Sequence, residues 1–85
     1  MTSKIFFITG ANSGFGFAIA EAAMRTGHTV IGTVRSEAAR ASLQERLPGV
    51  RTVLCAVTEF DRVPDIVAKA ESEHGAVDVL INNAG

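Results

Sequence analysis

Three glycines lie close together near the start of the chain, where residues 9–16 read TGANSGFG. An apolar stretch precedes them and an alanine-rich stretch follows, so we expect a tight turn between a strand and a helix. A helix N-terminus attracts phosphate, because it carries unpaired backbone N–H groups and a partial positive charge. We expect Gly10 to permit the turn, Gly14 to let the backbone approach a pyrophosphate, and Gly16 to let the helix pack closely on the sheet. The polar members add contacts to phosphate or ribose, and the whole predicted set is Gly10, Asn12, Ser13, Gly14, Phe15 and Gly16.

A second polar group follows the next β-branched stretch, at Arg35 and Ser36. A dinucleotide site selective for NAD carries an acidic residue about 20 residues beyond the glycine loop, where it accepts bonds from the ribose hydroxyls. The segment GTVRS at 32–36 has no such residue, and the Arg35 guanidinium suits a 2′-phosphate, with help from Ser36. These residues favour NADP over NAD. Glu37 is the counter-argument, because a small shift of the turn would bring its carboxylate to the ribose.

Other reactive side chains are few and isolated. The chain has no tyrosine or tryptophan, and its one cysteine, Cys55, lies in the apolar run VLCAV. We interpret Cys55 as a small buried thiol. His28 and His74 have no neighbouring ligands at metal spacing, so we read both as surface residues and expect no metal site.

The hydrophobic pattern predicts the elements that position these residues. Uninterrupted apolar or β-branched stretches predict strands over 4–9, 29–34, 50–57 and 77–81. Helical periodicity predicts helices over 15–26, 38–47 and 62–74. The expected buried faces are Ile19, Ala22 and Ala23 in the first helix, Ala39, Leu43 and Leu47 in the second, and Val63, Ile66, Val67 and Ala70 in the third.

Helix ends are marked by capping residues. Ser36 is the expected N-cap of the second helix, and Gly27 and Gly75 are expected to close the first and third. For the third helix we choose Asp61 as N-cap over Thr58, because a start at Thr58 would place Pro64 in the helix interior.

Strands and helices alternate along 85 residues, enough for one domain and not two. Consecutive strands joined by helices are parallel, with right-handed crossovers. The predicted fold class is α/β, a Rossmann-type doubly wound parallel sheet, truncated, with strand order 3-2-1-4. Residues 1–85 would form the N-terminal part of a single dinucleotide-binding domain.

Two motifs resemble those of the short-chain dehydrogenase/reductase family. One is TGxxxGxG, present at 9–16, and the other is NNAG, present at 82–85 directly after the fourth predicted strand. The resemblance implies that Asn82, Asn83, Ala84 and Gly85 hold the central sheet together and lie beside the cofactor, with Asn83, Ala84 and Gly85 as its predicted contacts. The family often has an Asp that contacts adenine after the third strand, and here that segment reads AVT, which leaves a backbone contact from Val57.

The resemblance also implies an NADP-dependent oxidoreductase that interconverts a small carbonyl compound and an alcohol. The family's catalytic Ser and Tyr-x-x-x-Lys lie beyond NNAG, so we expect no catalytic residue among these 85 and no activity from them alone. The alternatives are a non-catalytic NADP-binding or sensor module of the same fold and, with less support, another Rossmann family such as a methyltransferase.

Charge and hydropathy set expectations about partners. The net charge is −1, so nothing suggests nucleic acid as a partner. Neither a secretory leader nor a membrane span is apparent, and we expect a cytoplasmic protein. The fourth strand would end the truncated sheet as an open edge and the first would be partly bare, so we expect poor solubility or a homo-oligomer.

Overall fold

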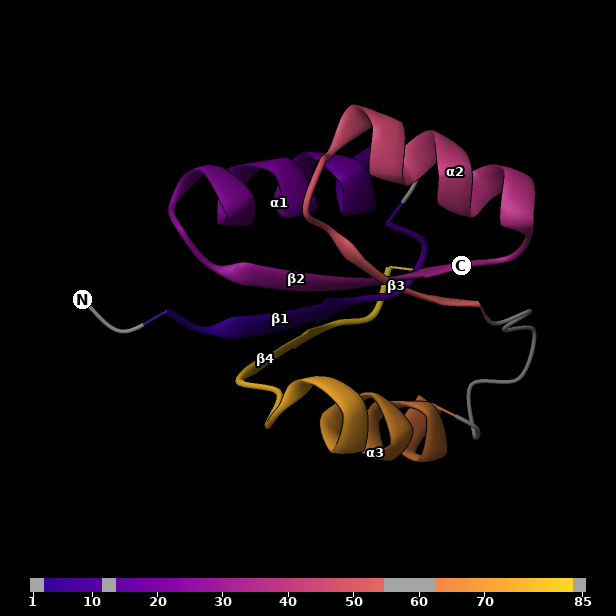
Figure 1. Ribbon diagram of the computed structural model, residues 1–85. Helices are drawn as coiled ribbons and strands as arrows, with labels where there is room; N and C mark the ends of the chain where they lie inside the picture. The colour runs from indigo at the N-terminus through magenta and orange to yellow at the C-terminus, as the bar shows by residue number, and fades with distance from the viewer. Residues whose placement is uncertain (1–2, 12–13, 55–62, 84–85) are drawn as a thin grey trace.

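The computed structural model describes residues 3–11, 14–54 and 63–83 of the chain. Strands and helices alternate along it, as the sequence predicts (Figure 1). The elements are β1 (Ile5–Ile8), α1 (Gly14–Arg25), β2 (Thr29–Val34), α2 (Glu37–Arg46), β3 (Arg51–Leu54), α3 (Val63–His74) and β4 (Val79–Ile81).

The strands form one parallel sheet in the order β3-β2-β1-β4, which confirms the predicted fold class and strand order. The register pairs Ile8 of β1 with Gly32 of β2 on one side and with Ile81 of β4 on the other. On the far side of β2, Val34 pairs with Leu54 of β3. The two central strands are therefore β1 and β2. β1 precedes the predicted polar segment at 9–16, and β2 precedes the one at 35–36.

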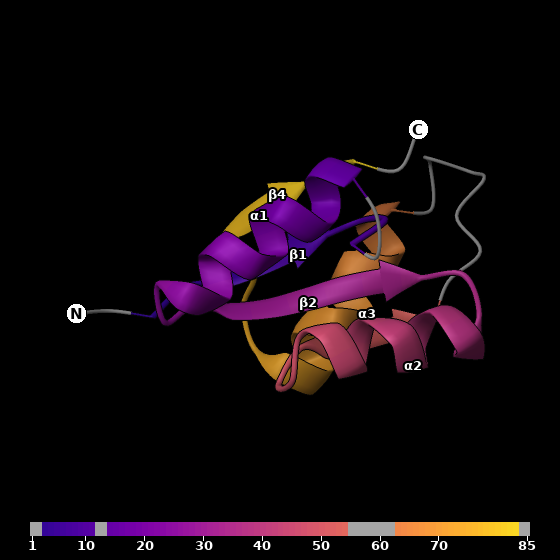
Figure 2. The same cartoon turned by 90° about the horizontal axis from the view of Figure 1, so that it is seen from above.

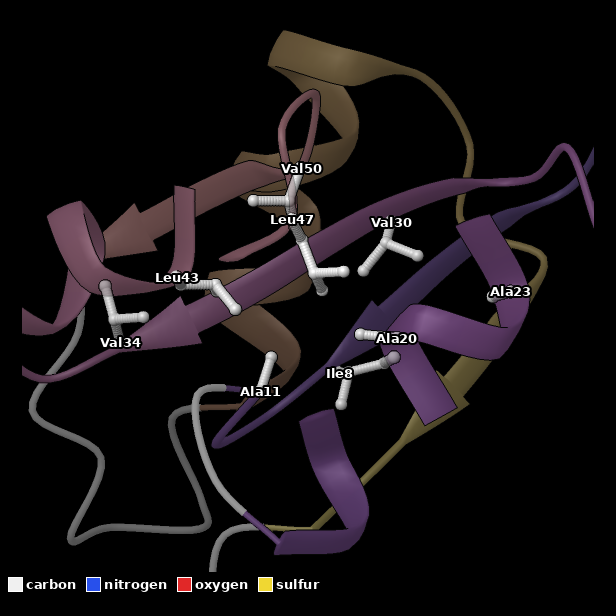
Figure 3. Packing of buried hydrophobic residues seen from close by; sticks show 9 residues of the cluster. All are labelled: Ile8, Ala11, Ala20, Ala23, Val30, Val34, Leu43, Leu47 and Val50. Atoms are coloured by element: carbon white, nitrogen blue, oxygen red, sulfur yellow. The ribbon is translucent and has the colours of Figure 1, made fainter. Parts of the chain in front are cut away.

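Helices cover the two faces of the sheet unequally. α1 and α2 lie side by side on one face and α3 lies alone on the other (Figures 1 and 2). Under α1 and α2 is the larger core, whose packing Figure 3 shows: Ile8, Ala11, Ala20, Ala23, Val30, Val34, Leu43, Leu47 and Val50. Under α3 the fully buried group is smaller: Phe7, Ile31 and Ala70. Ile66 and Val67 pack against it from α3, as their spacing predicts.

The buried face of α1 differs from the prediction by one position. Its buried residues are Gly16, Ala20 and Ala23, whereas Ala22 is exposed. Successive helical residues are turned by about 100°, so Ala22 and Ala23 do not share one narrow face. The prediction chose Ala22 in place of Ala20, and residue type alone does not distinguish these two alanines.

The prediction of a partly bare first strand holds only for its first half. Ile5 and Phe6 are half-buried, but Phe7 and Ile8 are completely buried, the former on the α3 face and the latter on the α1 and α2 face. The exposed large aliphatic side chains are instead on the edge strands, Leu54 of β3 at 45% and Leu80 of β4 at 49%.

Most helix ends follow their local signals. Ser36 caps α2, with its Oγ accepting the Ala39 N–H at 3.1 Å, and Gly27 and Gly75 follow α1 and α3 with φ of 93° and 110°. Pro64 lies in the first turn of α3, as expected from a start later than Thr58. The proposed cap Asp61, the candidate Thr58 and Cys55 lie outside the described residues.

β4 begins at Val79, two residues later than the sequence predicts. The Val77 N–H is donated to the Glu71 carboxylate at 2.7 Å, so at this residue the backbone bonds to α3 before the strand begins. The end of β3 predicted over 55–57 lies outside the described residues.

Candidate functional site

The segments predicted to bind a ligand meet at one edge of the sheet, because parallel strands place their carboxyl ends together. Residues 9–11 and 14–16 follow β1, residues 35–37 follow β2, and residues 82–83 follow β4. Seen from above, the start of α1 and the end of β4 lie side by side (Figure 2). We call this group of segments the carboxyl edge.

Two glycines of the loop have backbone conformations that other residues seldom adopt. Gly10 has φ of 64° and Gly14, the first residue of α1, has φ of 57°. A Cβ built on Gly14 would meet nothing within 4 Å, so the space beside it is open. Next to it, Phe15 is 79% exposed. The first N–H groups of α1 therefore begin at an accessible point, where backbone donors have no partner within the helix.

Gly16 lies where a larger side chain does not fit. A Cβ on Gly16 would collide with the carbonyl oxygen of Gly10 and would lie 2.7 Å from Nδ2 of Asn83. The first turn of α1 thus rests directly on the glycine loop and on the residues that follow β4. This close approach brings the N-terminus of α1 down to the carboxyl edge.

Side chains from the first and last strands join the two motifs. Thr9, completely buried after β1, accepts the Asn83 N–H on its Oγ1 at 2.8 Å and donates to Oδ1 of Asn82 at 3.2 Å. Nδ2 of Asn83 donates to the Gly10 carbonyl oxygen at 3.4 Å. The polar residues after β4 therefore hold the backbone of the glycine loop in place.

Sequence reasoning missed two residues of this site, Gly32 and Thr33, both in β2. Oγ1 of Thr33 accepts the Gly10 N–H at 3.0 Å, and Thr33 is buried. A Cβ on Gly32 would lie 2.7 Å from Cβ of Ala11 and 3.3 Å from Cδ2 of Leu43. A glycine inside a strand often marks a close backbone approach, and that signal was present in the sequence.

The segment after β2 is exposed, and two of its side chains already have partners within α2. Arg35 is exposed directly beyond the end of β2, and Ser36 is exposed with its Oγ bonded to the Ala39 N–H. Glu37, weighed above as a ribose ligand, pairs with Arg40, whose Nη1 lies 3.1 Å from its Oε1. Glu37 therefore has an ion-pair partner within α2.

The remaining predicted contacts lie outside the described residues: Asn12, Ser13, Val57, Ala84 and Gly85. Both histidines lie inside the described ranges and are partly exposed. His28 accepts the Lys4 N–H on Nδ1 at 3.0 Å, and Nδ1 of His74 lies 3.3 Å from Nη1 of Arg51. Within residues 3–11, 14–54 and 63–83, no three acidic, His or Cys side chains gather at a metal-binding distance. No helix in those ranges is long and apolar enough to cross a membrane.

Comparison with known families gives one match over almost the whole chain. Residues 4–85 match the model of the short chain dehydrogenase family. The chain belongs to the short-chain dehydrogenase family. Short-chain dehydrogenases are NAD(P)-dependent oxidoreductases, and their shared fold is the parallel sheet described above.

Individual proteins are similar to this chain over its whole length. The chain is 38% identical over 86 residues to a 3-oxoacyl-[acyl-carrier-protein] reductase of Vibrio harveyi, covering 100% of this chain and 35% of that protein. A 3-ketodihydrosphingosine reductase of Bacteroides thetaiotaomicron is 41% identical over 85 residues, covering 100% and 29%. The crystal structure of a short-chain dehydrogenase from Streptomyces avermitilis superposes with a TM-score of 0.83 at 44% identity, covering 99% and 31%.

The chain thus spans about a third of the length of the short-chain dehydrogenases that it matches, and it corresponds to their N-terminal part. In this part lie the glycine loop, the first and second strands and the residues that follow the fourth strand. The carboxyl edge therefore lies in the part of the chain that corresponds to the N-terminal portion of short-chain dehydrogenases.

Proposed function

We propose that the carboxyl edge binds a nicotinamide dinucleotide with a preference for NADP, as part of an enzyme that interconverts a small carbonyl compound and an alcohol. The observation that carries this proposal is the contact of Gly16 with Gly10 and Asn83, where only a hydrogen atom fits. That contact aims the N-terminus of α1 at the open space beside Gly14. A cradle of this kind fits a pyrophosphate.

The residues proposed to hold the dinucleotide come from four segments, three of which bind parts other than the 2′-phosphate. Backbone N–H groups at the start of α1 would bind the pyrophosphate, with Gly14 leaving room for it and Asn12 and Ser13 adding polar contacts. Val57 would meet the adenine through its backbone, and residues 83–85 would flank the remainder. When bound, the dinucleotide supplies or accepts a hydride. These residues bind and orient it.

The preference for NADP rests on charge. The exposed Arg35 offers a planar guanidinium directly after β2, where a selective NAD site would place a carboxylate. Glu37 is the nearest acidic residue, and its ion pair with Arg40 reduces its availability to ribose hydroxyls. Ser36 keeps its N-cap role while its hydroxyl hydrogen remains able to point toward a phosphate oxygen.

The test compares two ligands that differ only by the 2′-phosphate. We expect 2′,5′-ADP to bind about tenfold more tightly than 5′-AMP, because a charge-assisted pair to Arg35 contributes on this scale. Titration followed by backbone NMR shifts measures both affinities. Arg35→Ala should remove the difference, whereas Arg25→Ala should keep it, because Arg25 is an exposed arginine in the last turn of α1. Equal affinities in the unsubstituted protein would show that Arg35 does not select the 2′-phosphate.

The second candidate is a non-catalytic NADP-binding module of the same fold. The contacts described at the carboxyl edge hold a loop and a helix N-terminus in place, and they would serve a binding module as well as an enzyme. Binding of NADP without turnover by the full polypeptide that carries these residues would support it. A Tyr-x-x-x-Lys pair in that polypeptide, with turnover lost on Tyr→Phe, would support the enzyme.

We infer self-association through the exposed edge of β4. Leu80 pairs in register with the buried Phe7, so both side chains are on the α3 face, but Leu80 is 49% exposed. A partly bare apolar edge strand is a template for pairing with another strand. Size-exclusion chromatography of a polypeptide of residues 1–85 should give an oligomer that Leu80→Lys dissociates. Leu54→Lys, on the other edge strand β3, serves as the control and should leave the oligomer intact. A monomer without either substitution would contradict the inference.

A further inference from the structure

We propose that Thr33 is a positioning residue for the dinucleotide, fixing the first glycine of the loop from the neighbouring strand. This inference rests on the proposed function, because it concerns how the loop is held for its ligand. Thr33 is at 3% exposure, and its Oγ1 accepts the Gly10 N–H at 3.0 Å. Thr33 belongs to β2 and lies 23 positions away along the chain.

The peptide groups of Gly10 are held from both sides. The N–H of Gly10 is bonded to Thr33 of β2, and its carbonyl oxygen accepts from Asn83 after β4. The same carbonyl oxygen is the atom that a Cβ on Gly16 would strike. Gly10 is therefore held between β2 and the residues after β4, and α1 rests on it.

This arrangement separates two roles within the loop. The Gly10 N–H is already used by Thr33, so it orients the turn and does not bind phosphate. The donors left for phosphate are those at the start of α1, which lack partners within the helix. Their direction depends on the Gly10 carbonyl group, because Gly16 approaches that group directly. The carbonyl group is joined through the Gly10 Cα to the N–H that Thr33 holds. A small displacement of a positioned group weakens binding without abolishing the fold.

Gly32 adds a second restraint from the same strand. Its missing side chain leaves room for Ala11, which is completely buried and follows Gly10. Neighbouring residues of β2 thus hold two consecutive residues of the loop, one by a hydrogen bond and one by close packing. Removing the Thr33 hydroxyl leaves the packing intact, so the substitution isolates the hydrogen bond.

The experiment measures two ligands with the full polypeptide that carries these residues. NADP⁺ contains the pyrophosphate that the loop would hold, whereas adenosine 2′-monophosphate does not. We expect Thr33→Val to weaken NADP⁺ binding about tenfold, since the loop is no longer held in the geometry that the pyrophosphate needs, and to leave adenosine 2′-monophosphate unchanged. Thr33→Ser retains the acceptor and should restore NADP⁺ binding. Thr29→Val, the same change at the other end of β2, should alter neither affinity.

A merely structural role would not change the ratio of the two affinities. Equal weakening of both ligands, or no weakening of either, would overturn the role of Thr33. Failure of the unsubstituted protein to bind NADP⁺ or NAD⁺ would instead overturn the proposed function. Should Thr33→Val not fold, Thr33→Ala compared with Thr33→Ser gives the same ratio. Hydrogen exchange at the Gly10 amide, expected to be about tenfold faster in the variant that lacks the hydroxyl, reports the bond directly.

Discussion

Side-chain to backbone hydrogen bonds occur both at the carboxyl edge and at the opposite edge of the sheet, but they differ in burial. At the opposite edge, which we call the amino edge (residues 3–5, 26–29 and 75–78), side chains bond to exposed backbone. Asp78 accepts the Ile5 N–H at 2.8 Å, His28 accepts the Lys4 N–H at 3.0 Å, and Ser3 donates to the Gly27 carbonyl oxygen at 3.0 Å. These bonds fasten the beginnings of strands.

At the carboxyl edge the corresponding side chains are buried. Thr9 and Thr33 are at 1% and 3% exposure, and they hold the loop from below while the start of α1 stays accessible. The buried bonds fix a loop beneath an accessible helix N-terminus, whereas the exposed bonds at the amino edge only tie the chain together. If the proposed function holds, substitutions at the carboxyl edge should change ligand binding and substitutions at the amino edge should change stability alone.

The largest expected difference is in catalytic activity. A polypeptide of residues 1–85 should show no NADPH oxidation above a protein-free blank with a panel of aldehydes and ketones. The carboxyl edge then binds without reacting, because the 85 residues contain no tyrosine to serve as acid or base. Turnover by a sample of verified mass and purity would show that this edge carries chemistry of its own.

Gly16→Val should lower the free energy of unfolding by about 3 kcal/mol and abolish dinucleotide binding, because the added atoms collide with Gly10 and Asn83. Denaturant unfolding and NADP⁺ titration measure the two effects. Ala20→Val is the matched control, since Ala20 is buried on the same helix but away from the loop. It should lower stability and leave the affinity of the folded fraction unchanged. Normal binding by folded Gly16→Val would contradict the close contact proposed to aim α1.

Gly14→Ala against Gly27→Ala compares the two ends of α1 directly. Both glycines have positive φ, 57° and 93°, and neither has an atom within 4 Å of a built Cβ. Each substitution should therefore lower stability by about 1–2 kcal/mol through backbone strain. Only Gly14→Ala should also weaken NADP⁺ binding, by about tenfold or more, because its Cβ enters the space proposed for the pyrophosphate. Equal affinities in the two variants would make the loop purely structural.

The smallest effect is expected at the amino edge. Asp78→Ala removes the acceptor of the Ile5 N–H and should lower the free energy of unfolding by about 1 kcal/mol, because the exposed donor turns to water. NADP⁺ affinity should stay the same. A loss of affinity larger than the loss of folded protein explains would mean that the two edges are coupled.

Much of the fold could be predicted because its signals are local. β2 begins and ends at the expected residues, and Ser36 caps α2 through a bond to Ala39, three residues away. Turn glycines at 10, 14 and 27 have the positive φ for which glycine is suited. Two of the errors concern contacts between elements. The Val77 N–H is donated to Glu71 of α3 before β4 begins, and the second half of β1 is buried by helices on both faces.

Local sequence signals account for the order of the elements, the glycine loop and the polar segment after β4, because each depends on residues close together in the chain. The contacts by which Thr33 and Gly32 hold the loop form only when the strands come together. Their contacts exist because β2 pairs with β1 and so places two residues of the strand interior beside Gly10 and Ala11. No local pattern encodes that pairing, since parallel neighbours meet only after an intervening helix has crossed the sheet.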